Sequence, residues 1–188
     1  MDYLSKYVLN NLIQFENDDV IGNTWSYLFY FSLIMVLNAF LLLGAPSDIN
    51  FTFLILVFLS SFAGVSFLAY LLHAAMTILE DKIHIYKALA TVTIGSLTFS
   101  VGLLFYALIG LVNVTIPEVT VLLTLAQYLV LVVTLVMTLT SSIRVAEDLY
   151  KTRLLNVVIS ILTVYLGVVL GFRTILADTV MDFLRIFI

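Results

Sequence analysis

Side chains suited to catalysis are scarce in this chain of 188 residues, which has two histidines and no cysteine. Two acidic pairs, Glu80 with Asp81 and Glu147 with Asp148, are close enough in sequence to act as an acid and a base. Both pairs lie beside basic residues in polar stretches, which is more typical of solvated loops. Neither histidine belongs to a His-Glu-x-x-His zinc motif. The sequence therefore predicts no enzymatic activity and no metal or cofactor site.

A second group of polar side chains stands inside long apolar runs. Asn38, His73 and Gln127 are the costliest of these in hydrocarbon, because each needs a hydrogen-bond partner or water. No Asp, Glu, Lys or Arg occurs near the middle of those runs, which argues against a proton relay, a voltage sensor or a transporter of charged substrates. The candidates for a polar path that carries a neutral solute are Asn38, His73, Thr124, Gln127 and Thr134.

The composition places these residues in a lipid bilayer. Hydrophobic residues make up 63% of the chain and charged residues 11%, and the mean hydropathy is +1.18. One water-soluble core could not bury so much apolar surface. A bilayer core of roughly 30 Å needs about 20 apolar residues for each helical span. We therefore expect an all-α integral membrane protein, with the lipid bilayer as its main partner. The net charge of −4 argues against a nucleic-acid partner.

Polar breaks divide the chain into five expected transmembrane helices, at 24–43, 51–79, 88–112, 119–140 and 154–172. The first segment, 1–19, has apolar residues on one helical face and polar residues on the other, so it is expected to be an amphipathic interfacial helix in the cytoplasm. The tail, 175–188, has the same pattern. The expected organisation is thus an interfacial helix (1–19), a five-helix transmembrane domain (20–174) and a second interfacial helix (175–188).

The distribution of lysine and arginine predicts the orientation of the spans. With the N-terminus in the cytoplasm, six of the eight basic residues fall on the cytoplasmic side, where such residues are usually enriched. These six are Lys6, Lys82, Lys87, Arg144, Lys151 and Arg153. Arg173 and Arg185 then lie outside, after the last span. We therefore expect a multi-pass protein with a cytoplasmic N-terminus and an external C-terminus.

Small and hydroxyl-bearing residues recur at helical spacing in four of the expected spans. Such stripes let helices approach closely and hydrogen-bond to each other, so packing is the leading interpretation and a polar path is the alternative. The stripes are Ala63, Ser66, Tyr70, His73 and Thr77; Ala88, Thr91, Gly95, Thr98 and Gly102; Thr120, Thr124, Gln127, Thr134, Thr138 and Ser141; and Asn156, Ser160, Thr163, Gly167 and Gly171. The candidate helix-packing residues are Gly95, Thr98, Gly102, Gly167 and Gly171. We expect a homo-oligomer or a hetero-oligomer with other membrane helices.

The third expected span opens with Tyr86-Lys87-Ala88-Leu89-Ala90, small residues follow through Gly102, and the fourth span runs through 141–144 into a basic loop. These features of the second half of the chain, together with five expected spans, short loops and the expected orientation, resemble the Yip family, the Ypt-interacting membrane proteins. The resemblance implies a non-enzymatic membrane scaffold. In eukaryotes such scaffolds bind prenylated Rab GTPases and help shape or traffic ER and Golgi membranes. The short N-terminal region is more similar to that of prokaryotic members, which favours the cell membrane over the ER or Golgi.

Three functions remain open from the sequence. The first is a membrane scaffold or interaction protein, which the packing stripes and the absence of buried charge favour. The second is a transporter or channel for a neutral or weakly charged solute, which the polar stripes favour. The third is an accessory subunit of a larger membrane complex, since a small bundle with short loops suits that role.

Overall fold

The computed structural model describes residues 20–42, 51–79, 84–115, 119–150 and 153–171. These residues form five helices and no strand: α2 (Val20–Leu42), α3 (Phe51–Leu79), α4 (Ile85–Thr115), α5 (Thr120–Tyr150) and α6 (Leu154–Gly171). Four of them, α2 to α5, are long and apolar enough to cross a membrane, and α6 is a shorter apolar helix. The prediction of a helical membrane bundle therefore agrees with the structure. The expected interfacial helices at 1–19 and 175–188 lie outside the described residues.

The helices begin and end close to the expected spans, with one clear exception. Helix α5 continues to Tyr150, ten residues beyond the expected end of the fourth span at Thr140. In this extension Val145, Ala146 and Tyr150 are buried, whereas Arg144, Glu147 and Asp148 are exposed. An amphipathic segment of this kind stays helical in water because its apolar stripe packs against the bundle. The acidic pair at 147–148 therefore lies on a helix and not in a loop.

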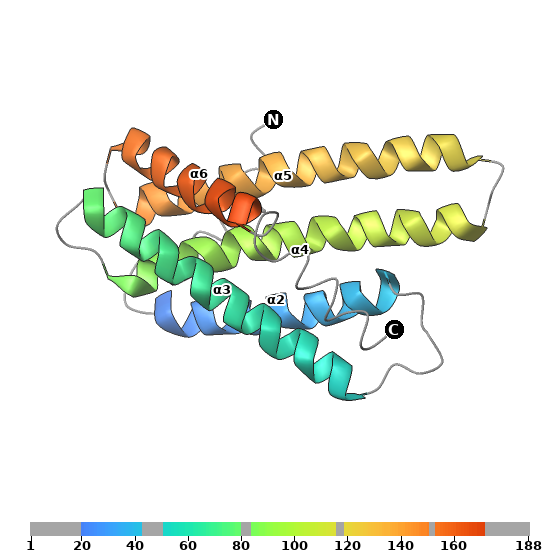
Figure 1. Cartoon of the computed structure of the whole chain (residues 1–188), viewed down its shortest axis with the longest axis horizontal. Coiled ribbons are helices and arrows are strands. Elements are labelled where there is room, and N and C mark those ends of the chain that lie inside the picture. Colours follow the sequence, from blue (N-terminus) through green and yellow to red (C-terminus); the bar gives the residue numbers. More distant parts are fainter. Residues whose placement is uncertain (1–19, 43–50, 80–83, 116–118, 151–152, 172–188) are drawn as a thin grey trace.

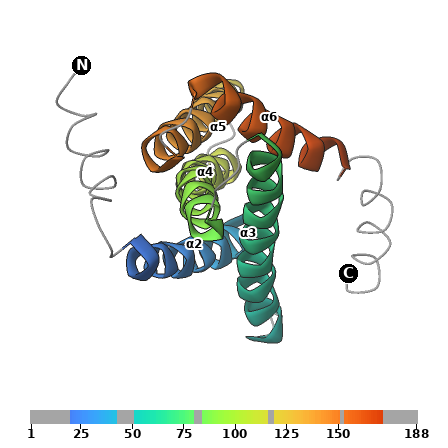
Figure 2. The same ribbon diagram turned by 90° about the vertical axis from the view of Figure 1, so that its left-hand side faces the viewer.

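Helix α4 lies at the centre of the bundle. It contacts α2, α3 and α5, whereas α6 packs against α3 and α5. The end view in Figure 2 shows α4 between α2 and α5, with α3 and α6 along one side. Nine consecutive residues of α4, 88–96, are buried. A helix buried on every face needs neighbours all round it, and the many small side chains of this segment let those neighbours approach closely.

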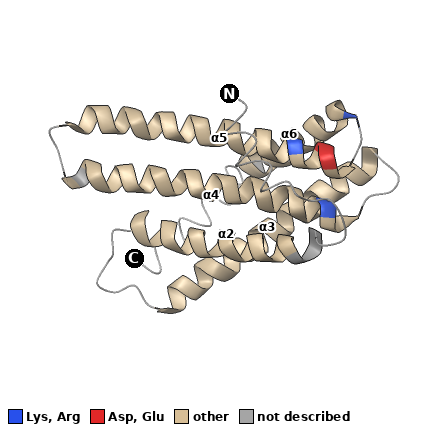
Figure 3. Ribbon diagram, turned by 180° about the vertical axis from the view of Figure 1, so that it is seen from behind, with Lys and Arg blue, Asp and Glu red and all other residues tan. Residues whose placement is uncertain are grey.

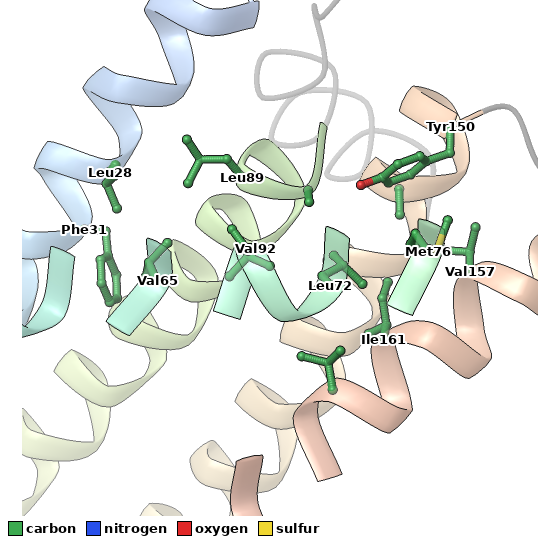
Figure 4. Packing of buried hydrophobic residues seen from close by; sticks show 14 residues of the cluster. Leu28, Phe31, Val65, Leu72, Met76, Leu89, Val92, Tyr150, Val157 and Ile161 are labelled. Atoms are coloured by element: carbon green, nitrogen blue, oxygen red, sulfur yellow. The ribbon is translucent and has the colours of Figure 1, made fainter. Parts of the chain in front are cut away.

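The apolar core joins all five helices near one end of the bundle (Figure 4). Its members include Leu28, Phe31, Val65, Leu72, Met76, Leu89, Val92, Tyr150, Val157 and Ile161. The charged residues that the structure describes lie at this same end, which we call the charged end (Figure 3). They are Lys87, Arg144, Glu147, Asp148 and Arg153. The Lys87 ammonium lies 5.8 Å from the centre of the Tyr150 ring, a cation–π contact that links the start of α4 to the end of α5.

Beyond the core, α4 and α5 continue side by side as an antiparallel hairpin that extends past α2, α3 and α6 (Figure 1). Each helix has 31 residues, about 46 Å at 1.5 Å per residue. We call residues 101–115 and 120–137 the distal half of the hairpin. Its large exposed side chains are aliphatic or aromatic, and include Val101, Phe105, Leu108, Leu122, Leu125, Tyr128, Val132 and Val136. This half of the hairpin therefore faces lipid or another chain.

Candidate functional site

The interface between α4 and α5 pairs glycines of one helix with polar side chains of the other. The pairs are Gly95 with Ser142, Gly102 with Thr134, and Gly110 with Gln127. A methyl group at Gly102 would overlap Oγ1 and Cγ2 of Thr134, and its carbon would lie 2.6 Å from Thr134 Cβ. The missing side chain at Gly102 thus lets α5 pack this closely. One interface therefore contains both kinds of candidate. The packing glycines Gly95 and Gly102 lie on α4, and the path candidates Gln127 and Thr134 lie on α5.

Two hydrogen bonds cross this interface in the distal half of the hairpin. Gln127 Nε2 donates to the carbonyl oxygen of Tyr106 at 3.3 Å. Asn113 Nδ2 donates to Thr124 Oγ1, also at 3.3 Å. Side-chain hydrogen bonds between membrane helices contribute about 0.6 kcal/mol on average. Such bonds chiefly fix which residues of α4 and α5 face each other.

Asn38 belongs to a different interface, between α2 and α4. Its side chain is 1% exposed, and its Nδ2 donates to the carbonyl oxygen of Ser100 at 2.8 Å. The other amide atom, Oδ1, is buried without a hydrogen-bond partner. Asn38 therefore anchors α2 to α4 and is not brought together with Thr124, Gln127 or Thr134.

Three helices meet at a polar contact that the sequence analysis did not find. Ser142 of α5 and Tyr165 of α6 share a hydrogen bond of 3.3 Å between their hydroxyl oxygens. A side chain at Gly95 of α4 would overlap Ser142 Oγ and lie 2.9 Å from Tyr165 Oη. We call Gly95, Ser142 and Tyr165 the three-helix junction. The four-residue spacing of Thr134, Thr138 and Ser142 could have identified Ser142 in place of the neighbouring Ser141.

Several hydroxyl groups, in the stripes and at other positions of the helices, donate to a carbonyl of their own helix. Thr98 Oγ1 donates to the carbonyl oxygen of Ile94 at 3.0 Å, and Thr91 Oγ1 donates to that of Lys87 at 2.9 Å. Ser32, Ser61, Ser66, Thr77 and Thr140 make the same kind of bond. This bond satisfies a hydroxyl in apolar surroundings without any ligand. It therefore favours packing over a solute path at these positions.

His73 lies on α3, apart from the other candidates. Its side chain is partly buried, and Nδ1 is buried without a hydrogen-bond partner. Within the bundle α3 packs through Val65, Ala69, Leu72 and Met76. Each of these stands one position before a member of the polar stripe predicted on this helix. The prediction that the polar stripe is the packing face of α3 was therefore wrong for this bundle. The apolar side chains one position before each member of the stripe pack into the core instead.

Gly167 and Gly171 were proposed for close packing of the last span. The structure describes no packing contact for either glycine within this bundle. Gly167 is exposed, and a Cβ there would meet no atom within 4 Å. Gly171 ends α6, and its surroundings lie outside the described residues. Helix α6 instead buries Val157, Ser160 and Val164, together with Ile161. A close helix crossing at Gly167 stays a prediction.

In the part of the chain that the structure describes, no group of three or more His, Asp or Glu side chains could hold a metal ion. No family model, curated protein or solved structure matches the chain. A proposal for the function therefore has to be argued from the contacts within the bundle. Most of the polar candidates lie in helix interfaces, and the distal half of the hairpin leaves its apolar side chains exposed.

Proposed function

We propose that this chain is a non-enzymatic integral membrane scaffold, similar to the Yip family, that organises membranes or docks partner proteins through helix packing. One observation carries the proposal: most of the candidate polar side chains inside the membrane either pack in helix interfaces or bond within their own helix. Thr134 and Gln127 pack against glycines of α4, and the hydroxyl of Thr98 bonds to its own helix. These groups already have contacts within the bundle. The exposed surface most suited to a partner is therefore the apolar distal half of the α4–α5 hairpin.

The outward side of α5 is the surface that we assign to docking. Leu125, Tyr128, Val132 and Val136 follow a helical spacing of three, four and four residues and so lie along one side of the helix. Between 58% and 67% of each side chain is exposed. None carries a charge, so a neighbouring helix can pack there without burying an ion. We call these four residues the docking face, and its partner is a helix of a second copy or of another membrane protein.

Cross-linking from single cysteines tests the docking face, because the natural chain contains no cysteine. Leu125→Cys, coupled to a benzophenone maleimide and illuminated in native membranes, should give a strong adduct with one protein of defined mass. The matched control is Leu166→Cys on α6, which is 57% exposed but lies outside the docking face. It should give a much weaker adduct. Equal adducts from both positions, or adducts with lipid alone, would contradict the docking face.

We further propose five spans with the N-terminus in the cytoplasm and the C-terminus outside, in a cell membrane. Helix α6 has 18 residues, about 27 Å at 1.5 Å per residue. That length is close to the roughly 30 Å of a bilayer core, which supports α6 as the fifth span. Lys87, Arg144 and Arg153 all lie at the charged end (Figure 3). Basic residues favour the cytoplasmic side, so we assign the charged end to the cytoplasm.

Labelling of introduced cysteines tests this topology. Thr115 and His84 are exposed at opposite ends of α4. A membrane-impermeant maleimide should label Thr115→Cys in intact cells, and His84→Cys only after the membrane is permeabilised. Arg173→Cys, which follows α6 in the sequence, should also be labelled in intact cells if α6 crosses the membrane. Labelling of His84→Cys in intact cells would contradict the orientation, and protection of Arg173→Cys would contradict the fifth span.

A transporter or channel for a neutral or weakly charged solute is the second candidate function. Several buried polar atoms among the described residues have no hydrogen-bond partner, including Asn38 Oδ1, His73 Nδ1 and Asn113 Oδ1. Such atoms can bind water or a solute. Solute flux in reconstituted vesicles that disappears in Gln127→Leu would favour this function.

An accessory subunit of a larger membrane complex is the third candidate, and stoichiometric co-purification with that complex would identify it.

A further inference from the structure

A groove with a volume of about 520 Å³ lies between α4 and α5. Val101 and Phe105 of α4 and Leu129 and Val133 of α5 are among the residues that line it. The groove runs along α4 from position 94 to position 109, about 22 Å at 1.5 Å per residue. It falls inside the parts of both helices that are apolar enough to cross a membrane. An occupant therefore reaches it from the hydrocarbon of the bilayer.

The lining of the groove selects an occupant without charge and without hydrogen-bonding groups. Among the residues that the structure describes, no charged residue lines the groove, and the polar side chains that line it are those of Thr98 and Thr134. Thr98 Oγ1 already donates to the carbonyl oxygen of Ile94 at 3.0 Å. Thr134 is 5% exposed and packs against Gly102. A polar or ionic ligand would thus lose its hydration without gaining partners in the groove. The complementary chemistry is that of a hydrocarbon.

The dimensions of the groove separate a hydrocarbon chain from a partner helix. A volume of about 520 Å³ lies in the range of roughly 300 to 1,000 Å³ that is usual for pockets that take a small molecule. An α-helical segment about 22 Å long and at least about 10 Å wide with its side chains would occupy about 1,700 Å³. The groove is therefore too small to enclose a helix, whereas its length along α4 suits one extended hydrocarbon chain.

We propose that this groove binds one acyl chain of a bilayer phospholipid, so that the lipid forms part of the α4–α5 hairpin surface. The acyl chain lies along the groove, between Val101 and Phe105 of α4 and Leu129 and Val133 of α5. The site does not depend on the proposed docking function. Leu125, Val132 and Val136 of the docking face do not line the groove, so each surface can be tested without the other.

Photolabelling with a lipid tests the groove in the intact chain. The protein is reconstituted in dioleoyl-phosphatidylcholine vesicles that contain a small fraction of phosphatidylcholine with a diazirine on one acyl chain. It is then extracted in mild detergent, washed to remove loosely held lipid and illuminated. Mass spectrometry should place the adducts mainly on groove residues such as Val101, Phe105 and Val133. Adducts spread over the exposed apolar surface in proportion to exposure would overturn the proposal, as would a second protein chain cross-linked into the groove.

A groove-filling variant gives an independent measurement. Val133→Trp places a large side chain in the groove, and Leu135→Trp places the same side chain on α5 outside both the groove and the docking face. Both positions are about half exposed, at 47% and 48%, and both variants are compared at equal helix content and equal elution volume. The quantity measured is the phospholipid that stays bound after extraction in mild detergent. Val133→Trp should lose most of this lipid, and Leu135→Trp should retain it like the natural chain. Equal retention in both would overturn the proposal. If Val133→Trp does not fold, Val101→Phe fills the groove from α4 and must give the same loss.

Discussion

Gly102→Ala should lower the free energy of unfolding of the bundle by about 1 to 3 kcal/mol, the usual effect of overpacking a close contact. The added methyl would overlap the side chain of Thr134, so α4 and α5 would have to move apart. Denaturant titration in detergent micelles, followed by circular dichroism, measures this change. The fluorescence of Trp25, which stacks on Phe62 at a ring distance of 5.9 Å, reports separately on the contact between α2 and α3.

Gly64→Ala is the matched control for Gly102→Ala. Gly64 lies inside α3, and a Cβ there would meet no atom within 4 Å. Since alanine favours a helix over glycine by about 1 kcal/mol, this variant should be neutral or slightly more stable. Thr134→Ala, added to Gly102→Ala, removes the two overlapping atoms and should restore part of the lost stability. If Gly102→Ala were as harmless as Gly64→Ala, the packing role of Gly102 would be wrong.

Gly95→Ala should detach α6 from the hairpin and also lower the free energy of unfolding by about 1 to 3 kcal/mol. The new methyl would overlap Ser142 Oγ and approach Tyr165 Oη at the three-helix junction. The closer overlap is with Ser142 of α5, and because Ser142 is hydrogen-bonded to Tyr165, its displacement also weakens the contact between α5 and α6. Hydrogen–deuterium exchange should therefore rise in α6 more than in α2.

Two further variants show whether this effect is specific to the three-helix junction. Tyr165→Phe in the Gly95→Ala background removes the atom that would lie 2.9 Å from the new carbon, so it should recover part of the protection of α6. Gly167→Ala changes a glycine of α6 that has open space around it, so it should leave exchange in α6 unchanged or lower. Unchanged exchange of α6 in Gly95→Ala would show that the junction does not hold α6.

The hydropathy of the sequence was sufficient to predict a bundle of membrane helices, because runs of apolar residues long enough to cross a bilayer have few other uses. The bounds of α3 were predicted at both ends, since polar segments flank it on either side. The end of α5 was predicted ten residues too early, because hydropathy marks where a helix leaves the hydrocarbon and not where it stops. Whether α6 crosses the membrane is still a prediction.

Individual contacts were harder to predict than helices. On α3 the polar stripe and the buried stripe differ by one position, for example Ser66 and Val65. In lipid the outward face is as apolar as the inward face, so no amphipathic signal distinguishes them. On α4 the glycines Gly95 and Gly102 were found, but their partners depend on how α5 is placed against α4. Tyr165 was missed for the same reason, because its hydrogen bond to Ser142 depends on how α6 is placed against α5.

The most direct test of the scaffold function is the mass of the assembly that contains this chain, purified from its native membrane in a mild detergent. Native mass spectrometry of that sample should give a complex of defined stoichiometry, heavier than the 21.0 kDa chain. Cross-links from Leu125→Cys in the same complex should map its partner to the docking face. A lone 21.0 kDa chain that carries a neutral solute across vesicles, and loses that activity in Gln127→Leu, would contradict the scaffold function.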